Sequence, residues 1–177
     1  MSQPRSSTVF WLFGLPASGK STLARHLLAH LRTEHGADCG FYDADVERTT
    51  GVLRDLGWSP SDRVATIRTL AHAAGRHRVG IVTLVTSTES ERRLAADLLG
   101  ERLHLIHVHA PEPVRHARDA LRTVRAYRTN PAPDAPELSW SDPEQPALAL
   151  DTTAPLSTTV TALYTFAATT LANATSL

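Results

Sequence analysis

The chain has 177 residues, 42% of them hydrophobic, a composition typical of a globular protein with a core of ordinary domain size. Its 18 basic and 18 acidic residues leave no net charge, which argues against nucleic acid or a membrane surface as a partner. The only cysteine, Cys39, excludes an intrachain disulfide and favours a reducing compartment. Because no signal-type or membrane-spanning apolar run is present, we expect a cytoplasmic protein.

The first predicted element is a buried strand from Val9 to Phe13, followed at once by GLPASGKST at Gly14 to Thr22. Leucines at helical spacing come next, so the Gly-x-x-x-x-Gly-Lys-Ser pattern stands between a strand and a helix, the context that gives it meaning. Backbone N–H groups of such a loop bind phosphate, Lys20 reaches the outer phosphates and Ser21 faces Mg²⁺. We therefore expect ATP to be bound by Gly14, Pro16, Ala17, Ser18, Gly19, Lys20, Ser21 and Thr22.

The rest of the chain alternates between strand and helix patterns. Further strands are predicted at Cys39 to Asp43, Val79 to Val85, Leu103 to His109 and Ala147 to Leu150. Helices are predicted at Val46 to Leu56, from Pro60 with Ser59 as cap, at Glu91 to Leu99, at Pro111 to Ala126 and around Val160 to Leu171. In the helix that Ser59 caps, the predicted buried face is Val64, Ile67, Leu70, Ala71 and Ala74. The alternation predicts an α/β fold with a parallel sheet covered on both faces, in one domain over residues 1–177.

One segment, residues 129–146, breaks this pattern. It reads TNPAPDAPELSWSDPEQP, rich in proline and acid and without periodicity. A stretch of this kind between two strands is usually a lid, a binding loop or a plain surface loop. We predict a lid over the phosphate site, in which Trp140 is a candidate to cover a ring of the ligand.

Two carboxylates, Asp43 and Asp45, come at the end of the second predicted strand. Ligands of open α/β sheets bind at this edge. One carboxylate there can hold Mg²⁺, and the other can orient or deprotonate an attacking hydroxyl. The spacing does not decide which residue has which role, although Asp43 is the preferred metal ligand. Asp45 is alternatively a helix cap.

Two groups of arginines are candidates for binding anions. Guanidinium groups suit phosphate or sulfate, because they stay charged and donate hydrogen bonds in pairs. The first group follows the two aspartates and would bind an anionic acceptor: Arg48, Arg63 and Arg68. The second group falls on one face of the helix before the lid, next to an apolar face at Val114, Ala117, Leu121 and Val124 that we expect to be buried. It would clamp phosphates on closure or be a solvated surface: Arg115, Arg118, Arg122 and Arg125.

Several motifs follow the order found in one enzyme family, from Val9 to about Asp119 and again at Pro143 to Thr152. They are GLPASGKSTLA, YDADVER, DLGWS with the following Asp-Arg and Ile-Arg pairs, an Ala-Arg-Asp segment and PEQPALALDT. With these motifs the chain resembles the adenylylsulfate kinases, which phosphorylate the 3′-hydroxyl of adenosine 5′-phosphosulfate with MgATP. The resemblance implies a three-layer α/β/α P-loop NTPase fold with a five-stranded parallel sheet of order 2-3-1-4-5. It also implies ATP and Mg²⁺, Arg118 near the adenine, a small-molecule acceptor and a possible homodimer.

The chain departs from this family mainly on the acceptor side. Thr66 stands where the family has Asn, and Thr88 to Arg92 keeps only the arginine of its Ile-Ser-Pro-x-Arg. Both family lysines are missing from Asp119 to Tyr127, and the aromatic Phe-Thr-Gly-Ile-Asp lid is absent. Each lost contact would cost ~1–3 kcal/mol of binding. We therefore expect an ATP-dependent kinase with altered acceptor specificity; a genuine adenylylsulfate kinase and a non-catalytic nucleotide-binding module remain alternatives.

Overall fold

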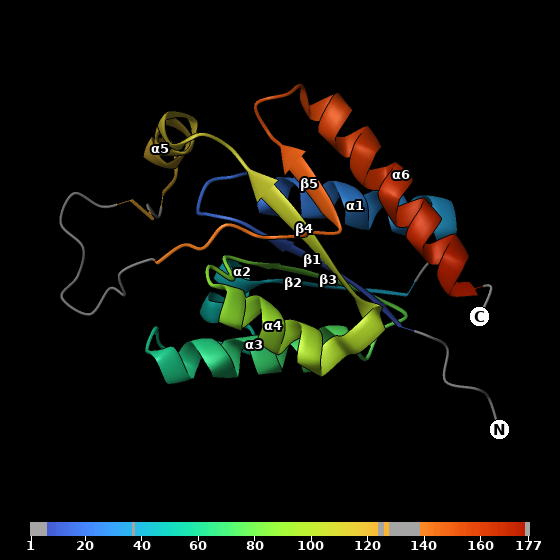
Figure 1. The fold of residues 1–177 in the computed structure, drawn as a ribbon, viewed down its shortest axis with the longest axis horizontal. Coiled ribbons are helices and arrows are strands. Elements are labelled where there is room, and N and C mark those ends of the chain that lie inside the picture. Colours follow the sequence, from blue (N-terminus) through green and yellow to red (C-terminus); the bar gives the residue numbers. More distant parts are fainter. Residues whose placement is uncertain (1–6, 37, 124–125, 128–138, 176–177) are drawn as a thin grey trace.

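The structure, a computed structural model, describes residues 7–36, 38–123, 126–127 and 139–175. Within these residues five strands form one parallel sheet in the order β2-β3-β1-β4-β5 (Figure 1). The strands are β1 (Thr8–Phe13), β2 (Cys39–Asp43), β3 (Val79–Leu84), β4 (Leu103–His109) and β5 (Leu148–Asp151). The predicted strands and their order are confirmed, with ends that differ by single residues.

Helices cover both faces of this sheet. They are α1 (Lys20–His35), α2 (Ala44–Thr50), α3 (Pro60–Ala74), α4 (Glu89–Leu99), α5 (Glu112–Ala120) and α6 (Leu156–Thr175), with a 3₁₀ turn at Gly100–Arg102. Helices α1 and α6 lie on one face, and α3 and α4 lie on the other (Figure 1). This arrangement is the predicted three-layer α/β/α fold.

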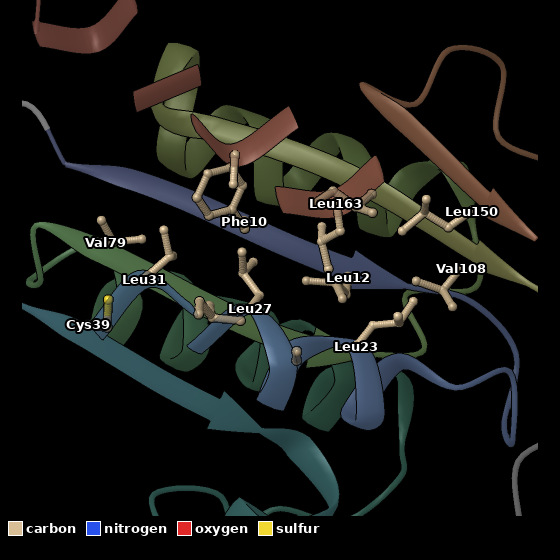
Figure 2. Packing of buried hydrophobic residues seen from close by; sticks show 14 residues of the cluster. Phe10, Leu12, Leu23, Leu27, Leu31, Cys39, Val79, Val108, Leu150 and Leu163 are labelled. Atoms are coloured by element: carbon tan, nitrogen blue, oxygen red, sulfur yellow. The ribbon is translucent and has the colours of Figure 1, made fainter. Parts of the chain in front are cut away.

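The central strand β1 is buried along its whole length. Phe10 and Leu12 face α1 and α6 and belong to one apolar cluster with Leu163 (Figure 2). Trp11 faces the opposite layer with α3 and α4, as strand alternation requires. Burying each such side chain contributes roughly 1.5–3 kcal/mol, so both faces hold β1 firmly. The strand thereby fixes the position of the loop that begins at the next residue, Gly14.

The predicted helix from Val46 to Leu56 is wrong at both ends. Helix α2 begins earlier because the Asp43 side chain accepts a hydrogen bond from Asp45 N, 3.1 Å away, as an N-cap. It ends before Gly51, whose φ of −115° and ψ of −149° leave the helical region. The chain then turns inward to bury Leu53 completely. Burial of Leu53 in the core therefore takes precedence over the helical spacing that predicted a helix as far as Leu56.

The helix that Ser59 caps is correctly predicted at its start. Ser59 and Asp62 form a reciprocal capping box, and Pro60 occupies the first turn. Its predicted buried face is wrong at one position, because Val64 is 41% exposed. Thr66 is buried in its place, with its hydroxyl accepting a hydrogen bond from an arginine. The other predicted positions are buried: Ile67, Leu70, Ala71 and Ala74.

The predicted helix from Pro111 to Ala126 is too long. Its predicted buried face is wrong at Ala117 and Leu121, while Val114 is half-buried and Val124 lies outside the described residues. Helix α5 ends at Ala120, and backbone N–H groups beyond it donate to both oxygens of Asp119. Leu121 is 90% exposed, whereas Arg115 and Asp119 are buried. These charged groups find hydrogen-bonding partners inside the protein, and those interactions offset the desolvation cost of their burial. Arg115 and Asp119 therefore face inward from α5, whereas the Arg122 side chain just beyond the helix is 38% exposed.

Of the predicted lid at 129–146, the residues up to 138 lie outside the described part. The remainder is fastened to α4 by Ser141, whose O and Oγ accept hydrogen bonds from Arg92 at 2.9 and 3.0 Å. Trp140 stacks on His107 with ring centroids 5.7 Å apart. Its ring therefore packs on the end of β4.

Candidate active site

The loop from Gly14 to Lys20 lies at the carboxyl end of β1 and leads directly into α1. Gly14 and Gly19 adopt φ angles of 149° and 103°, which L side chains rarely adopt. A Cβ on Gly14 would lie 2.0 Å from Val108 O, so the loop passes too close to β4 for any larger residue. Gly19 caps α1 without a side-chain hydrogen bond, which leaves the helix N-terminus available for an anion.

Lys20 Nζ lies inside this loop. It donates hydrogen bonds to Gly14 O and Leu15 O, both at 2.9 Å. Burial lowers the pKa of Lys20 from 10.5 to about 8, although the charges of Asp45 and Asp43 act in the opposite direction. The ammonium is therefore poised to exchange these carbonyls for phosphate oxygens, which would favour its charged form.

The lowered pKa of Lys20 predicts a pH-dependent affinity for ATP. Between about pH 8 and 10.5 the free protein binds fewer protons here than the unfolded chain, so this group's contribution to stability rises with pH. Phosphates raise the pKa again, so ATP binding takes up a proton above pH 8. We expect affinity to be flat below pH 8 and to fall by about tenfold per pH unit above it.

Lys20 is the only lysine of the chain, so amine labelling followed by mass spectrometry reads this pKa on a single peptide. The labelling rate should rise to half its maximum near pH 8, and MgATP should suppress it. A midpoint near 10.5, or no protection by MgATP, would contradict the prediction.

The two predicted aspartates lie beside this lysine but in different environments. Asp43 is buried and caps α2, whereas the Asp45 side chain is 69% exposed. Asp45 Oδ2 lies 3.2 Å from Arg122 Nη2, and Arg122 Nη1 lies 3.6 Å from Asp119 Oδ1. The structure thus brings together Lys20, both aspartates and Arg122 at the carboxyl edge of the sheet.

Oxygen donors suited to Mg²⁺ are present at this edge. Ser21 follows the lysine in the first turn of α1, and Asp43 ends β2. Hydroxyl and carboxylate oxygens are the donors that Mg²⁺ prefers. Among the described residues no cluster of three or more His, Cys, Asp or Glu side chains is placed to hold a metal. The donor set fits an ion held by one or two side chains together with phosphates and water.

Arg118 is joined to the phosphate loop through Thr152, a residue that the sequence motif contained but that had no predicted role. Arg118 Nη1 donates to Thr152 Oγ1 at 2.8 Å, and Nη2 donates to Thr152 O at 2.7 Å. The Thr152 hydroxyl lies 2.8 Å from Ser18 O and 3.2 Å from His109 O. Thr152 therefore ties the end of β5 to the loop and holds the Arg118 guanidinium beside it.

Tyr127 also contacts the phosphate loop, and no sequence signal singled it out. Its hydroxyl donates to Pro16 O at 3.0 Å and accepts a hydrogen bond from Arg115 Nη1. Its ring stacks on His116 with centroids 4.3 Å apart. Its backbone N–H donates to Asp119 Oδ2 at 2.9 Å. Arg115 thus supports the loop indirectly, through the Tyr127 hydroxyl.

Arg48 holds an aromatic side chain at the same edge. Its Nη1 donates to two carbonyls of the loop before α3, and its Nη2 donates to Thr66 Oγ1 at 3.0 Å. The guanidinium carbon lies 4.0 Å from the centroid of Trp58, which is 49% exposed. Burial lowers the pKa of Arg48, an effect that Asp45 opposes and Arg63 strengthens. These residues are therefore close neighbours of the catalytic candidates.

Arg63 is paired with a carboxylate. Its Nε lies 2.6 Å from Glu91 Oε1, and its Nη2 donates to Ser87 Oγ at 2.9 Å. Burial alone would raise the pKa of Glu91, but the hydrogen bond and charge of Arg63 hold it below its ordinary value. Of the other predicted residues, Arg68 is exposed on α3, and Arg125 lies outside the described residues.

Sequence comparison connects the chain to known proteins. A family profile described as adenylylsulphate kinase matches residues 6–128. An adenylyl-sulfate kinase of Paraburkholderia xenovorans is 38% identical over 117 residues, 63% of this chain and 64% of that protein, so the match spans a little under two thirds of the relative. An adenylyl-sulfate kinase of Myxococcus xanthus is 33% identical over 150 residues, 74% of this chain and 80% of that protein.

Structural comparison supports the fold. The crystal structure of APE1195 superposes with a TM-score of 0.74 at 26% identity and covers 92% of this chain and 95% of that one. The APS kinase CysC of Mycobacterium tuberculosis, solved with AMPPNP and APS, gives 0.71 at 20% identity, covering 92% and 98%. Across the described residues, no helix combines the length and apolar character that a membrane crossing needs.

Proposed function

Because the chain belongs to the adenylylsulphate kinase family of phosphotransferases, we propose that it transfers the γ-phosphoryl group of MgATP to a hydroxyl of an anionic, ring-bearing small molecule. One observation carries this proposal. The only lysine, two aspartates and the Arg48–Trp58 pair lie at one edge of the sheet, so a phosphate site and an acceptor site adjoin.

The environments of the side chains suggest their roles. Lys20 holds the outer phosphates within the loop. Ser21 and Asp43 hold Mg²⁺, which neutralises charge on the transferring phosphoryl group. Asp45 is more exposed and orients the acceptor hydroxyl or accepts its proton. Arg118, which Thr152 holds beside the loop, would contact the adenine.

The proposed acceptor site contains the planar ring of Trp58 and the positive charge of Arg48. The exposed face of Trp58 can stack on a planar ring, while Arg48 fixes the orientation of Trp58 from the other side. Adenylyl sulfate, named in the relatives, is the first acceptor to test. The test measures ADP release and the phosphorylated acceptor by mass spectrometry. Turnover of adenylyl sulfate at enzymatic rates supports a genuine adenylylsulfate kinase, whereas ATP binding without product from any alcohol supports a non-catalytic module.

A second candidate is an acceptor of lower negative charge, and the Arg63–Glu91 pair favours it. Glu91 is only 12% exposed and neutralises an arginine expected to bind the anionic group. The site then presents less positive charge than its arginines suggest.

Replacing Glu91 with glutamine tests this second candidate. Glutamine keeps the length of the side chain and an oxygen for the Thr88 N–H, but it frees the charge of Arg63. We expect the KM for adenylyl sulfate to fall by about three- to tenfold, with a smaller change in kcat. Glu89→Gln is the matched control, because Glu89 pairs with Arg92 and Arg93 instead. An unchanged or higher KM in Glu91→Gln would exclude a charge-reducing role for Glu91.

A further inference from the structure

Thr83 carries a buried hydroxyl with no partner. The residue is 2% exposed on β3, and Oγ1 has no hydrogen bond to any described residue. Ser18 Oγ is the only other such side-chain atom among the described residues. Burying an unpaired hydroxyl destabilises a protein, so this one calls for an explanation.

The direction of the Thr83 side chain follows from strand alternation. Val79 and Ile81, four and two residues earlier on β3, face the layer that contains α1. Thr83 therefore faces the same layer, because side chains of a strand alternate between its faces. The phosphate-binding lysine begins α1, so the hydroxyl lies on the face of the sheet that carries the phosphate loop.

The neighbours of Thr83 in the sheet narrow its possible partners. Its register partner on β1 is Leu12, which is apolar, and its register partner on β2 is Asp43. Asp43 shares the face, since Cys39 and Phe41 on the same strand pack into that layer. Asp43 Oδ1 accepts from Asp45 N, while Oδ2 has no hydrogen bond within the described part of the chain. An unpaired buried donor thus adjoins an unpaired acceptor oxygen.

We infer that Thr83 is a positioning residue whose hydroxyl donates a hydrogen bond to the Asp43 carboxylate, directly or through one water, when MgATP binds. This inference rests on the proposed function, which makes Asp43 a metal ligand. A hydrogen-bonding partner behind a metal-ligating carboxylate fixes its orientation, and its loss typically costs about tenfold or more in metal affinity. Because the hydroxyl has no partner among the described residues, its benefit is expected to arise in the complex.

Replacing Thr83 with valine distinguishes an effect on the free protein from an effect on its complex with MgATP. Valine matches the shape of threonine and removes only the hydroxyl, so the Tm of the free protein should stay the same or rise. The Mg²⁺ concentration that half-saturates ATP binding, measured by calorimetry, should rise by about tenfold, with a parallel loss in kcat. Thr83→Ser, which restores a hydroxyl, should recover most of both.

A matched control is Thr159→Val on α6. Thr159 is also buried, but its hydroxyl donates to Leu156 O at 3.0 Å. This variant should lower Tm and leave the Mg²⁺ requirement unchanged. If Thr83→Val lowers Tm without changing the Mg²⁺ requirement, the hydroxyl is purely structural and the inference is wrong. If the wild-type protein itself shows no Mg²⁺-dependent ATP binding, the proposed function fails instead.

Discussion

Lys20→Ala should lower kcat by at least about a thousandfold while the protein stays folded. The ammonium is held inside the phosphate loop by Gly14 O and Leu15 O, within reach of the oxygens on which charge would develop. Its removal also takes away a buried charge whose pKa is lowered by desolvation, so Tm should not fall. The measurement is ADP release in a coupled assay, together with thermal unfolding followed by circular dichroism.

Arg25→Ala is the control for this variant. Arg25 lies on the same helix, α1, and its side chain is exposed. We expect it to retain wild-type turnover and Tm. Near-normal turnover in Lys20→Ala would show that the loop does not bind the transferring phosphates.

Asp45→Asn should lower kcat by about 10²- to 10⁴-fold and leave ATP binding nearly unchanged. Asparagine keeps the shape of the side chain but can neither accept a proton nor attract Arg122 as strongly. Asp43→Asn should act differently, by raising the Mg²⁺ requirement. Measuring both kcat and the half-saturating Mg²⁺ concentration in the two variants shows which carboxylate acts on the acceptor and which one binds the metal.

Asp55→Asn serves as the control, because the Asp55 side chain is 91% exposed and contacts only Arg54 among the described residues. It should behave like the wild type. The assigned roles would be reversed if Asp45→Asn changed mainly the Mg²⁺ requirement and Asp43→Asn changed mainly kcat.

The strands and the phosphate loop could be predicted from sequence because their signals are local. The apolar run of β1 ends one residue before Gly14, and the two glycines of the motif, Gly14 and Gly19, both adopt positive φ. Local pattern failed at α5. Helical spacing placed Leu121 on a buried face and Arg115 on a stripe that would clamp phosphates or be solvated. Arg115 instead donates to Ala110 O and the Tyr127 hydroxyl and is buried, whereas Leu121 is exposed.

The residue pairs of the site that are distant in sequence could not be predicted from local sequence patterns. Arg63 and Glu91 are 28 residues apart, and neither residue type indicates the other. Thr152 reaches Ser18 across 134 residues through the packing of β5. Thr83 is an ordinary β-branched strand residue in the sequence, and only the register with Asp43 gives its hydroxyl a role. Such partners need the sheet order before they can be recognised.

The most direct measurement is a calorimetric titration of the wild-type protein with ATP, with and without Mg²⁺. A loop that grips the triphosphate through Lys20 and a metal predicts saturable binding that strengthens with Mg²⁺ and weakens above pH 8. Absence of any Mg²⁺-dependent affinity for ATP would contradict the central claim that this edge of the sheet is a kinase active site.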